Sequence, residues 1–117
     1  MIQIACISLP LRIPSINGII FRGANLRQWH YTARELISGM TIDMIPTVIP
    51  VIICITAEYE EVKYTVDCDN LYVKPLIDGL KGNVITQDGF REVVEVRKRS
   101  TQTGRNWVTV IVYEVEE

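Results

Sequence analysis

The longest apolar stretch of the chain, from Met44 to Ala57, sets the first limit on what the protein can fold into. It is shorter than the roughly 20 apolar residues that a membrane-spanning helix needs, and Pro46 and Pro50 interrupt it. A short apolar run of this kind favours a strand. We therefore predict a strand over Val48–Ala57, with Pro50 at its start or on a sheet edge, where the missing N–H is tolerated.

Two other segments have the spacing of helices. Apolar residues recur at helical intervals from Leu26 to Ile37, and Asn25 is a candidate N-cap. A second helix is predicted over Leu71–Leu80, beginning near Asn70 or Leu71, because Pro75 is harmless only in a first turn. The remaining segments are predicted as strands at 2–9, 90–99 and 106–115, a short strand at 62–66 and a loop at 12–25; the strands at 90–99 and 106–115 form a hairpin whose loop contains Gly104.

Composition indicates a single domain over residues 1–117 with its own core. Hydrophobic residues make up 48% of the 117, which is enough for a core that needs no disulfide or metal to stabilise it. Three cysteines, an odd number with no C-x-x-C pair, argue against a disulfide framework or a zinc site and favour a reducing compartment. The sequence starts without a charged leader or a small-residue cleavage site. We therefore expect a cytoplasmic protein without a membrane span.

Charge is unevenly distributed along the chain, although the net charge is only −2. Arginines dominate the first half, and the segment from Arg97 to Arg105 is purely basic. Acidic residues concentrate in 58–61, in 67–88 and at the end of the chain. The pI near 5.4 does not by itself suggest a nucleic-acid partner, but the two basic regions leave that partner open.

Acidic residues gather around the start of the second predicted helix. Asp67 and Asp69 follow an extended segment, where residues two apart point to the same side. Two close carboxylates repel each other unless a cation lies between them, and Mg²⁺ is often held by one or two carboxylates together with substrate phosphate. Lys74 lies about one turn further on and is suited to stabilise charge on a phosphate, while Asp88 follows the next apolar run.

Each of these residues also has a purely structural interpretation. Asp69 or Asn70 is a candidate helix cap, and Lys74 and Asp78 have the i, i+4 spacing of a surface ion pair. Asp88 and the glycine after it form a common turn sequence. The single histidine, His30, is more often a surface or satisfied helix residue than a base.

The combination is more specific than its parts. The segments "DCDNLYVKPLIDGL" and "GNVITQDGFREV" together resemble the signature of the RusA-type endodeoxyribonucleases, small Holliday-junction resolvases common in prophages. The early segment "ISLPLRIPSIN" is similar to the first strand and loop of that family. The resemblance implies an α+β domain with a single mixed β-sheet and two main helices packed against it, assembled as a symmetric homodimer.

The resemblance also implies roles for individual residues. Asp67, Asp69 and Asp88 would be the metal-binding carboxylates, Lys74 the catalytic lysine, and Asn70 and Asp78 supporting residues. The cofactor would be Mg²⁺, with Mn²⁺ as a substitute. Phosphates of branched DNA would be held by basic residues from the first half and from the predicted hairpin, namely Arg12, Arg22, Arg27, Arg97, Lys98, Arg99 and Arg105.

Two departures from the family pattern keep other interpretations open. The spacing from Asp69 to Lys74 is one residue longer than usual, and Gln87 stands where the family has a first carboxylate beside Asp88. The first hypothesis is a magnesium-dependent nuclease that resolves four-way junctions by paired nicks, in DNA recombination and repair. The second is a catalytically weak relative that only binds branched DNA or a protein partner. The third is an unrelated α+β interaction module.

Overall fold

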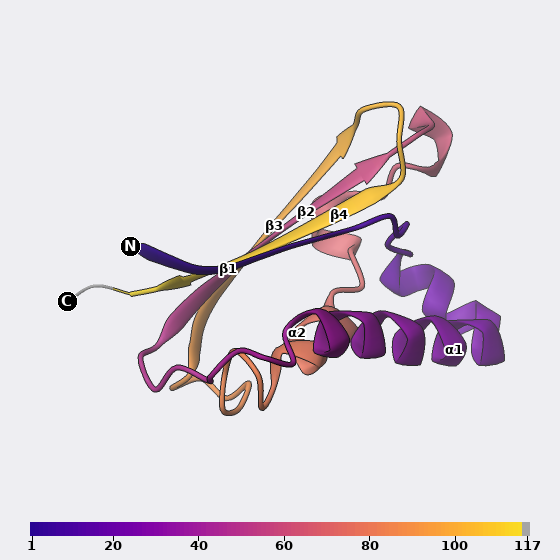
Figure 1. Cartoon of the computed structure of the whole chain (residues 1–117). Coiled ribbons are helices and arrows are strands. Elements are labelled where there is room, and N and C mark those ends of the chain that lie inside the picture. The colour runs from indigo at the N-terminus through magenta and orange to yellow at the C-terminus, as the bar shows by residue number, and fades with distance from the viewer. Residues whose placement is uncertain (116–117) are drawn as a thin grey trace.

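The computed structural model describes residues 1–115, and within residues 17–25 it describes the helical backbone without side chains. Two helices, two 3₁₀ turns and four strands alternate along this part of the chain (Figure 1). In order they are β1 (Ile2–Leu9), α1 (Ile16–Met40), β2 (Val51–Tyr59), η1 (Val62–Tyr64), η2 (Cys68–Asn70), α2 (Lys74–Leu80), β3 (Val93–Gln102) and β4 (Trp107–Glu114).

The four strands form one mixed sheet in the order β1-β4-β2-β3. β4 is antiparallel to both of its neighbours, β1 and β2, whereas β3 is parallel to β2. Both helices lie on one side of the sheet in Figure 1. The predicted α+β architecture, with one mixed sheet and two helices, is therefore confirmed.

The predicted hairpin between the last two strands is wrong, because β2 lies between β3 and β4. The connection passes over the end of β2, where the carbonyl of Tyr59 accepts hydrogen bonds from the N–H groups of Thr103 and Gly104 at 3.0 and 3.3 Å. Gly104 has a φ of 93°, which glycine adopts without strain. The turn signal was correct, but a short connection does not show whether another strand enters between the two it joins.

The basic residues 97–99 of the predicted hairpin therefore lie on β3, at the edge of the sheet. Arg97, Lys98 and Arg99 lie in the middle of β3, where they pair with Cys54, Ile55 and Thr56 of β2. Side chains alternate along a strand, so Lys98 points to the opposite face from its two neighbours.

Helix α1 begins at Ile16 rather than at Leu26, so the predicted N-cap at Asn25 is wrong and the loop predicted at 12–25 is limited to residues 12–15. Glycine and asparagine within 17–25 suggested a loop. Their helix penalties are at most about 1 kcal/mol each, which tertiary packing of the rest of the helix outweighs. The short strand predicted at 62–66 is instead the 3₁₀ turn η1 followed by extended residues.

The core lies between the sheet and the two helices. The inward side chains of β1, β2 and β4 are buried against Ala33 and Ile37 of α1 and against Leu76 and Leu80 of α2. Tyr59 is fully buried, and its hydroxyl donates a 2.7 Å hydrogen bond to the carbonyl of Ile13. Burial raises the pKa of Tyr59 to about 12, so this hydroxyl keeps its proton.

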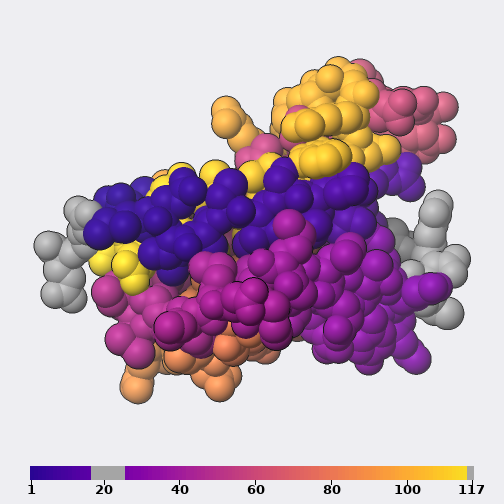
Figure 2. Space-filling view, in the orientation of Figure 1, coloured from indigo at the N-terminus to yellow at the C-terminus, as the bar shows by residue number. Residues whose placement is uncertain are grey.

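The connection from α1 to β2 carries several exposed apolar residues. Figure 2 shows this segment, in magenta, running beneath β1 and above the loop that follows α2. Thr47 forms an isolated bridge with Ile85 of that loop. Within residues 1–115, no helix has both the length and the apolar character to cross a membrane.

We predict that the ion pair between Arg105, in the connection from β3 to β4, and Glu58 makes the stability of the protein depend on pH in the acidic range. Arg105 donates two hydrogen bonds to Glu58 at 3.1 and 3.0 Å, and these lower the pKa of Glu58 below 4.5. The stabilisation is complete above pH 4.5 and is lost as the pH falls through the lower, folded-state pKa. Glu58→Gln should therefore lower the melting temperature near neutral pH and make no difference in stronger acid. Arg105→Gln should have the same effect, and the double variant should add nothing further.

A second prediction concerns Gly79, where α2 meets α1. A Cβ atom at this position would lie 2.6 Å from Cβ of Ile37 and 2.7 Å from the carbonyl oxygen of Arg34. A backbone oxygen cannot move aside cheaply, so Gly79→Ala should lower the free energy of unfolding by about 1–3 kcal/mol in urea titrations. Gly39→Ala is the control, because nothing lies within 4 Å of its Cβ. That variant should be neutral or up to about 1 kcal/mol more stable; equal effects at both glycines would contradict the close packing.

Candidate active site

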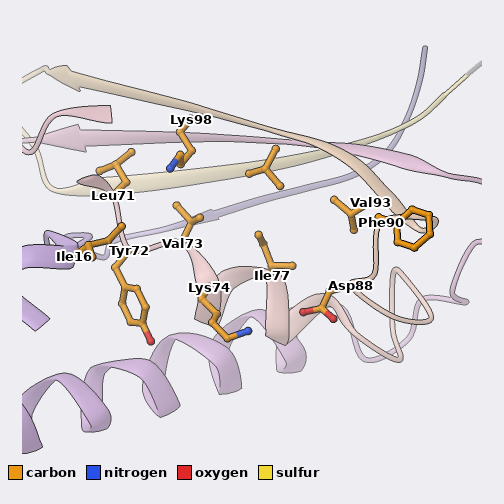
Figure 3. Close-up of a pocket in the computed structure, with 11 residues that line it drawn as sticks. Ile16, Leu71, Tyr72, Val73, Lys74, Ile77, Asp88, Phe90, Val93 and Lys98 are labelled. Atoms are coloured by element: carbon orange, nitrogen blue, oxygen red, sulfur yellow. The ribbon is translucent and has the colours of Figure 1, made fainter. Parts of the chain in front are cut away.

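A cleft of about 460 Å³ opens between β3 and the chain that leads into α2. Figure 3 shows Lys98 pointing from β3 toward Leu71 and Val73, with Phe90 at the far end and Lys74 and Asp88 on the helix side. The cleft is lined by Ile16, Leu71, Tyr72, Val73, Lys74, Ile77, Asp88, Phe90, Val93, Val96 and Lys98.

The cleft exists because β3 is an edge strand that the helices cover incompletely. Val93 and Val96 stay only partly buried against the core. On the other side, backbone bonds fasten the chain before α2: Tyr72 donates to the carbonyl of Pro14 at 3.1 Å, and Leu71 forms a bridge with Ser15. The result is a largely apolar cleft with two lysines and one aspartate among its walls.

Next to the cleft, charged side chains converge on Asp78, whose side chain is only 14% exposed. Its Oδ1 lies 3.6 Å from Nζ of Lys74 and 3.3 Å from Nζ of Lys81, without a hydrogen bond of good geometry. Nζ of Lys81 is also 3.3 Å from Asp88. Asp78 and, to a smaller extent, Asp88 raise the pKa of Lys81, so its positive charge is held between two carboxylates.

An imidazole from α1 completes the group, which we call the Asp78 cluster (His30, Tyr72, Lys74, Asp78, Lys81 and Asp88). Nε2 of His30 lies 3.5 Å from Oδ2 of Asp78, and Nδ1 lies 2.6 Å from the hydroxyl of Tyr72. Burial, and secondarily the charge of Asp78, raise the pKa of Tyr72. The phenol therefore stays protonated at neutral pH and is suited to hydrogen bonding rather than to nucleophilic attack.

Asp67 and Asp69 lie outside this cluster. Both are exposed and flank Cys68 in η2, so they do not occupy the strand end on which their common orientation was predicted. The segment is held against β3, because the hydroxyl of Ser100 hydrogen-bonds to the carbonyl of Val66. η2 therefore borders the end of the cleft at Leu71.

The start of α2 also differs from the prediction. The helix begins at Lys74, and its N-cap residue is Val73, which makes no side-chain capping bond. Pro75 lies in the first turn, as predicted. Asp69 and Asn70 therefore do not cap this helix: Asn70 is half-buried in η2, where its N–H bonds to the carbonyl of Asp67 at 2.9 Å.

The predicted metal ligands, Asp67, Asp69 and Asp88, have the carboxylate groups that a divalent cation needs, but they do not lie together in this structure. Carboxylate oxygens are the ligands that Mg²⁺ prefers. Among residues 1–115 with described side chains, however, no three His, Cys, Asp or Glu groups lie close enough to hold a metal ion. Asp67 and Asp69 face solvent, while Asp88 is paired with Lys81.

The predicted DNA-binding residues are dispersed. Arg97 forms an ion pair with Glu95 at 3.0 Å, Arg105 is bound to Glu58, and the Arg12 guanidinium lies 5.4 Å from the ring centre of Tyr64. Arg27 and Arg99 are exposed, Lys98 lines the cleft, and the side chain of Arg22 falls outside the described residues.

Several residues of the site were not found by sequence reasoning. Lys81 follows Lys74 by two helical turns, which is a usable signal for a shared face. Tyr72 stands inside the quoted motif without a predicted role, and His30 was assigned to a surface or satisfied helix position. No local pattern connects His30 to α2, because the contact joins elements far apart in the sequence.

Comparison of the chain with protein-family models and with curated proteins finds no match.

We predict that the Asp78 cluster is energetically coupled. Asp78→Asn keeps the shape of the side chain but leaves Lys74 and Lys81 without their shared carboxylate. It should lower the free energy of unfolding by about 1–3 kcal/mol, the usual cost of an unmatched partly buried polar group. Adding Lys81→Met should reverse part of that loss, which a double-mutant cycle in urea measures. Strictly additive effects would show that the two side chains do not interact.

Proposed function

We propose that the protein is a RusA-type, magnesium-dependent endodeoxyribonuclease that resolves four-way DNA junctions by paired symmetric nicks. Such an enzyme would act in the cytoplasm, in recombination and repair. The observation that carries the proposal is that Lys74 and Asp88, chosen from the sequence motif, line one cleft. The η2 turn, with Asp69 and its N-cap residue Asp67, ends at Leu71, which lines the same cleft.

In this proposal the chain's own cations position the scissile phosphate. The Lys74 side chain is 63% exposed, and Asp78 holds it at the edge of the cleft. Its ammonium group is placed to neutralise charge that develops on a phosphate oxygen. Asp67, Asp69 and Asp88 would hold Mg²⁺, which would supply an activated water and further charge neutralisation. A homodimer would present two equivalent sites to the two-fold arrangement of a four-way junction.

A second candidate is a protein that binds branched DNA without cutting it. The pairing of Asp88 with Lys81, and the separation of the three acidic residues into two groups, favour this alternative. Both candidates share the DNA partner and differ only in whether a cleavage site assembles.

The test is a nicking assay on a synthetic four-way junction, with magnesium, manganese or a chelator, and with linear duplex as the control substrate. The proposed enzyme should nick opposing strands of the junction in a metal-dependent manner and leave the duplex intact. Two nicks made within one binding event would indicate two active sites, as expected for a homodimer.

We predict that Lys74→Met lowers the cleavage rate by about 100-fold or more, because the developing charge loses its cation. Asp69→Asn should have a similar effect, and it should leave binding in chelator unchanged or tighter. Lys63→Met is the matched control, since Lys63 is similarly exposed (68%) but lies on η1. Normal junction binding without cleavage by any form would favour the second candidate. Normal cleavage by Lys74→Met would contradict the proposed role of Lys74.

A further inference from the structure

The character of the cleft is unusual for a surface that holds only a phosphate backbone. Its walls are mostly apolar, formed by Val73, Ile77, Val93 and Val96. Its volume falls in the roughly 300–1,000 Å³ range of sites for small organic molecules. That is room for unpaired nucleotides rather than for a base-paired duplex. A phosphate needs none of this apolar surface, so the cleft suits a ligand that also has an apolar part.

Phe90 presents an aromatic face at one end of the cleft. The residue is 81% exposed although it lines the cleft. The turn that carries it is fixed by two hydrogen bonds, from the N–H groups of Glu92 and Val93 to the carbonyl of Gly89 at 3.2 and 2.9 Å. The guanidinium of Arg91 lies 5.4 Å from the ring centre. An exposed ring on an anchored turn is a suitable surface for a base to stack on.

Lys98 supplies the charge that such a ligand would need. It points into the cleft from the core-facing side of β3 and is only partly exposed. Lys74, Lys81 and Arg97 all have carboxylate partners. The ammonium group of Lys98, in contrast, has no ion-pair or hydrogen-bond partner among the residues whose side chains the structure describes. A partly buried ammonium group without a counterion favours the binding of an anion.

We propose that the cleft binds an unpaired stretch of the DNA substrate, with one base stacked against Phe90 and the apolar walls and a phosphate further along the same strand on Lys98. This inference rests on the proposed function and names the part of the substrate that enters the cleft. Unstacking is least costly where bases are already poorly paired or single-stranded. A cleft for one free base would therefore favour the branch point of a junction over an intact duplex.

The experiment combines changes in the protein with changes in the DNA, in chelator, so that no cleavage is required. Dissociation constants are measured for four-way junctions in which an abasic site is moved stepwise through the branch. At one position the abasic site should weaken binding by the wild-type protein about fivefold or more, the value of one stacked base. Phe90→Ala should bind the intact junction as weakly as the wild-type protein binds the abasic junction. The abasic site should then cause no further loss of affinity in this variant. Phe90→Trp keeps an aromatic face, so it should bind the intact junction like the wild type and should again be weakened by the abasic site.

Two control variants make the result specific. Tyr64→Ala removes another exposed ring with a neighbouring cation, Lys63 at 4.9 Å, and should behave like the wild type. Lys98→Met should weaken binding to every junction and reduce the salt slope of log K by about one. Lys63→Met is its control, because Lys63 lies on η1 and does not line the cleft, so this change should alter neither the affinity nor the salt slope.

The possible outcomes separate this inference from the proposed function. If no abasic position weakens binding, or if Phe90→Ala keeps the full abasic effect, the nucleotide cleft is wrong while a junction nuclease remains possible. If the protein binds no DNA in any form, both proposals fail. Circular dichroism checks folding of each variant; should Phe90→Ala prove unfolded, Phe90→Leu, which keeps apolar bulk without an aromatic face, must abolish the abasic effect.

Discussion

The insertion of β2 between β3 and β4 is the arrangement on which the rest of the structure depends. β2 is paired along both edges, and its inward side chains are completely or almost completely buried. Because β3 runs parallel to β2, the chain between them must return to the end of the sheet at which β2 begins. This return carries η2, α2 and the loop with Asp88 and Phe90. The candidate site is therefore built largely on the connection that the parallel pairing requires, and β3 supplies its opposite wall.

Electrostatics divides the acidic residues into two environments. Asp78 and Asp88 are paired with lysines within a partly buried cluster, in which the imidazole of His30 also contacts Asp78. Asp67 and Asp69 remain in solvent, where ionisation is inexpensive and repulsion is weakened by water. Any cation that draws the two groups together has to compete with Lys81 for Asp88. The internal ion pairs thus set the affinity threshold that an external cation would have to exceed.

Much of the fold was predictable from local signals, and the site was predictable only in part. β1 matches its predicted range, and Pro75 lies in the first turn of α2 as expected. These features depend on neighbours in the sequence. The hairpin failed because strand order depends on which segment buries its side chains best, and a four-residue connection carries no information on that. Likewise, the motif residues Lys74, Asp78 and Asp88 were selected from the sequence, whereas His30 joins them only through the packing of α1 on α2.

The position of β4 has a consequence for how the protein is made. β4 is the last strand along the chain, yet it lies between β1, the first element, and β2. Until the ribosome has released β4, β1 has no partner in the sheet and β2 has one unpaired edge. Pairings of such wide separation in the sequence form slowly, and unpaired edges with apolar faces are prone to aggregation. A nascent chain that stalls before β4 therefore lacks the strand that joins β1 to β2, and we expect such chains to depend on chaperones.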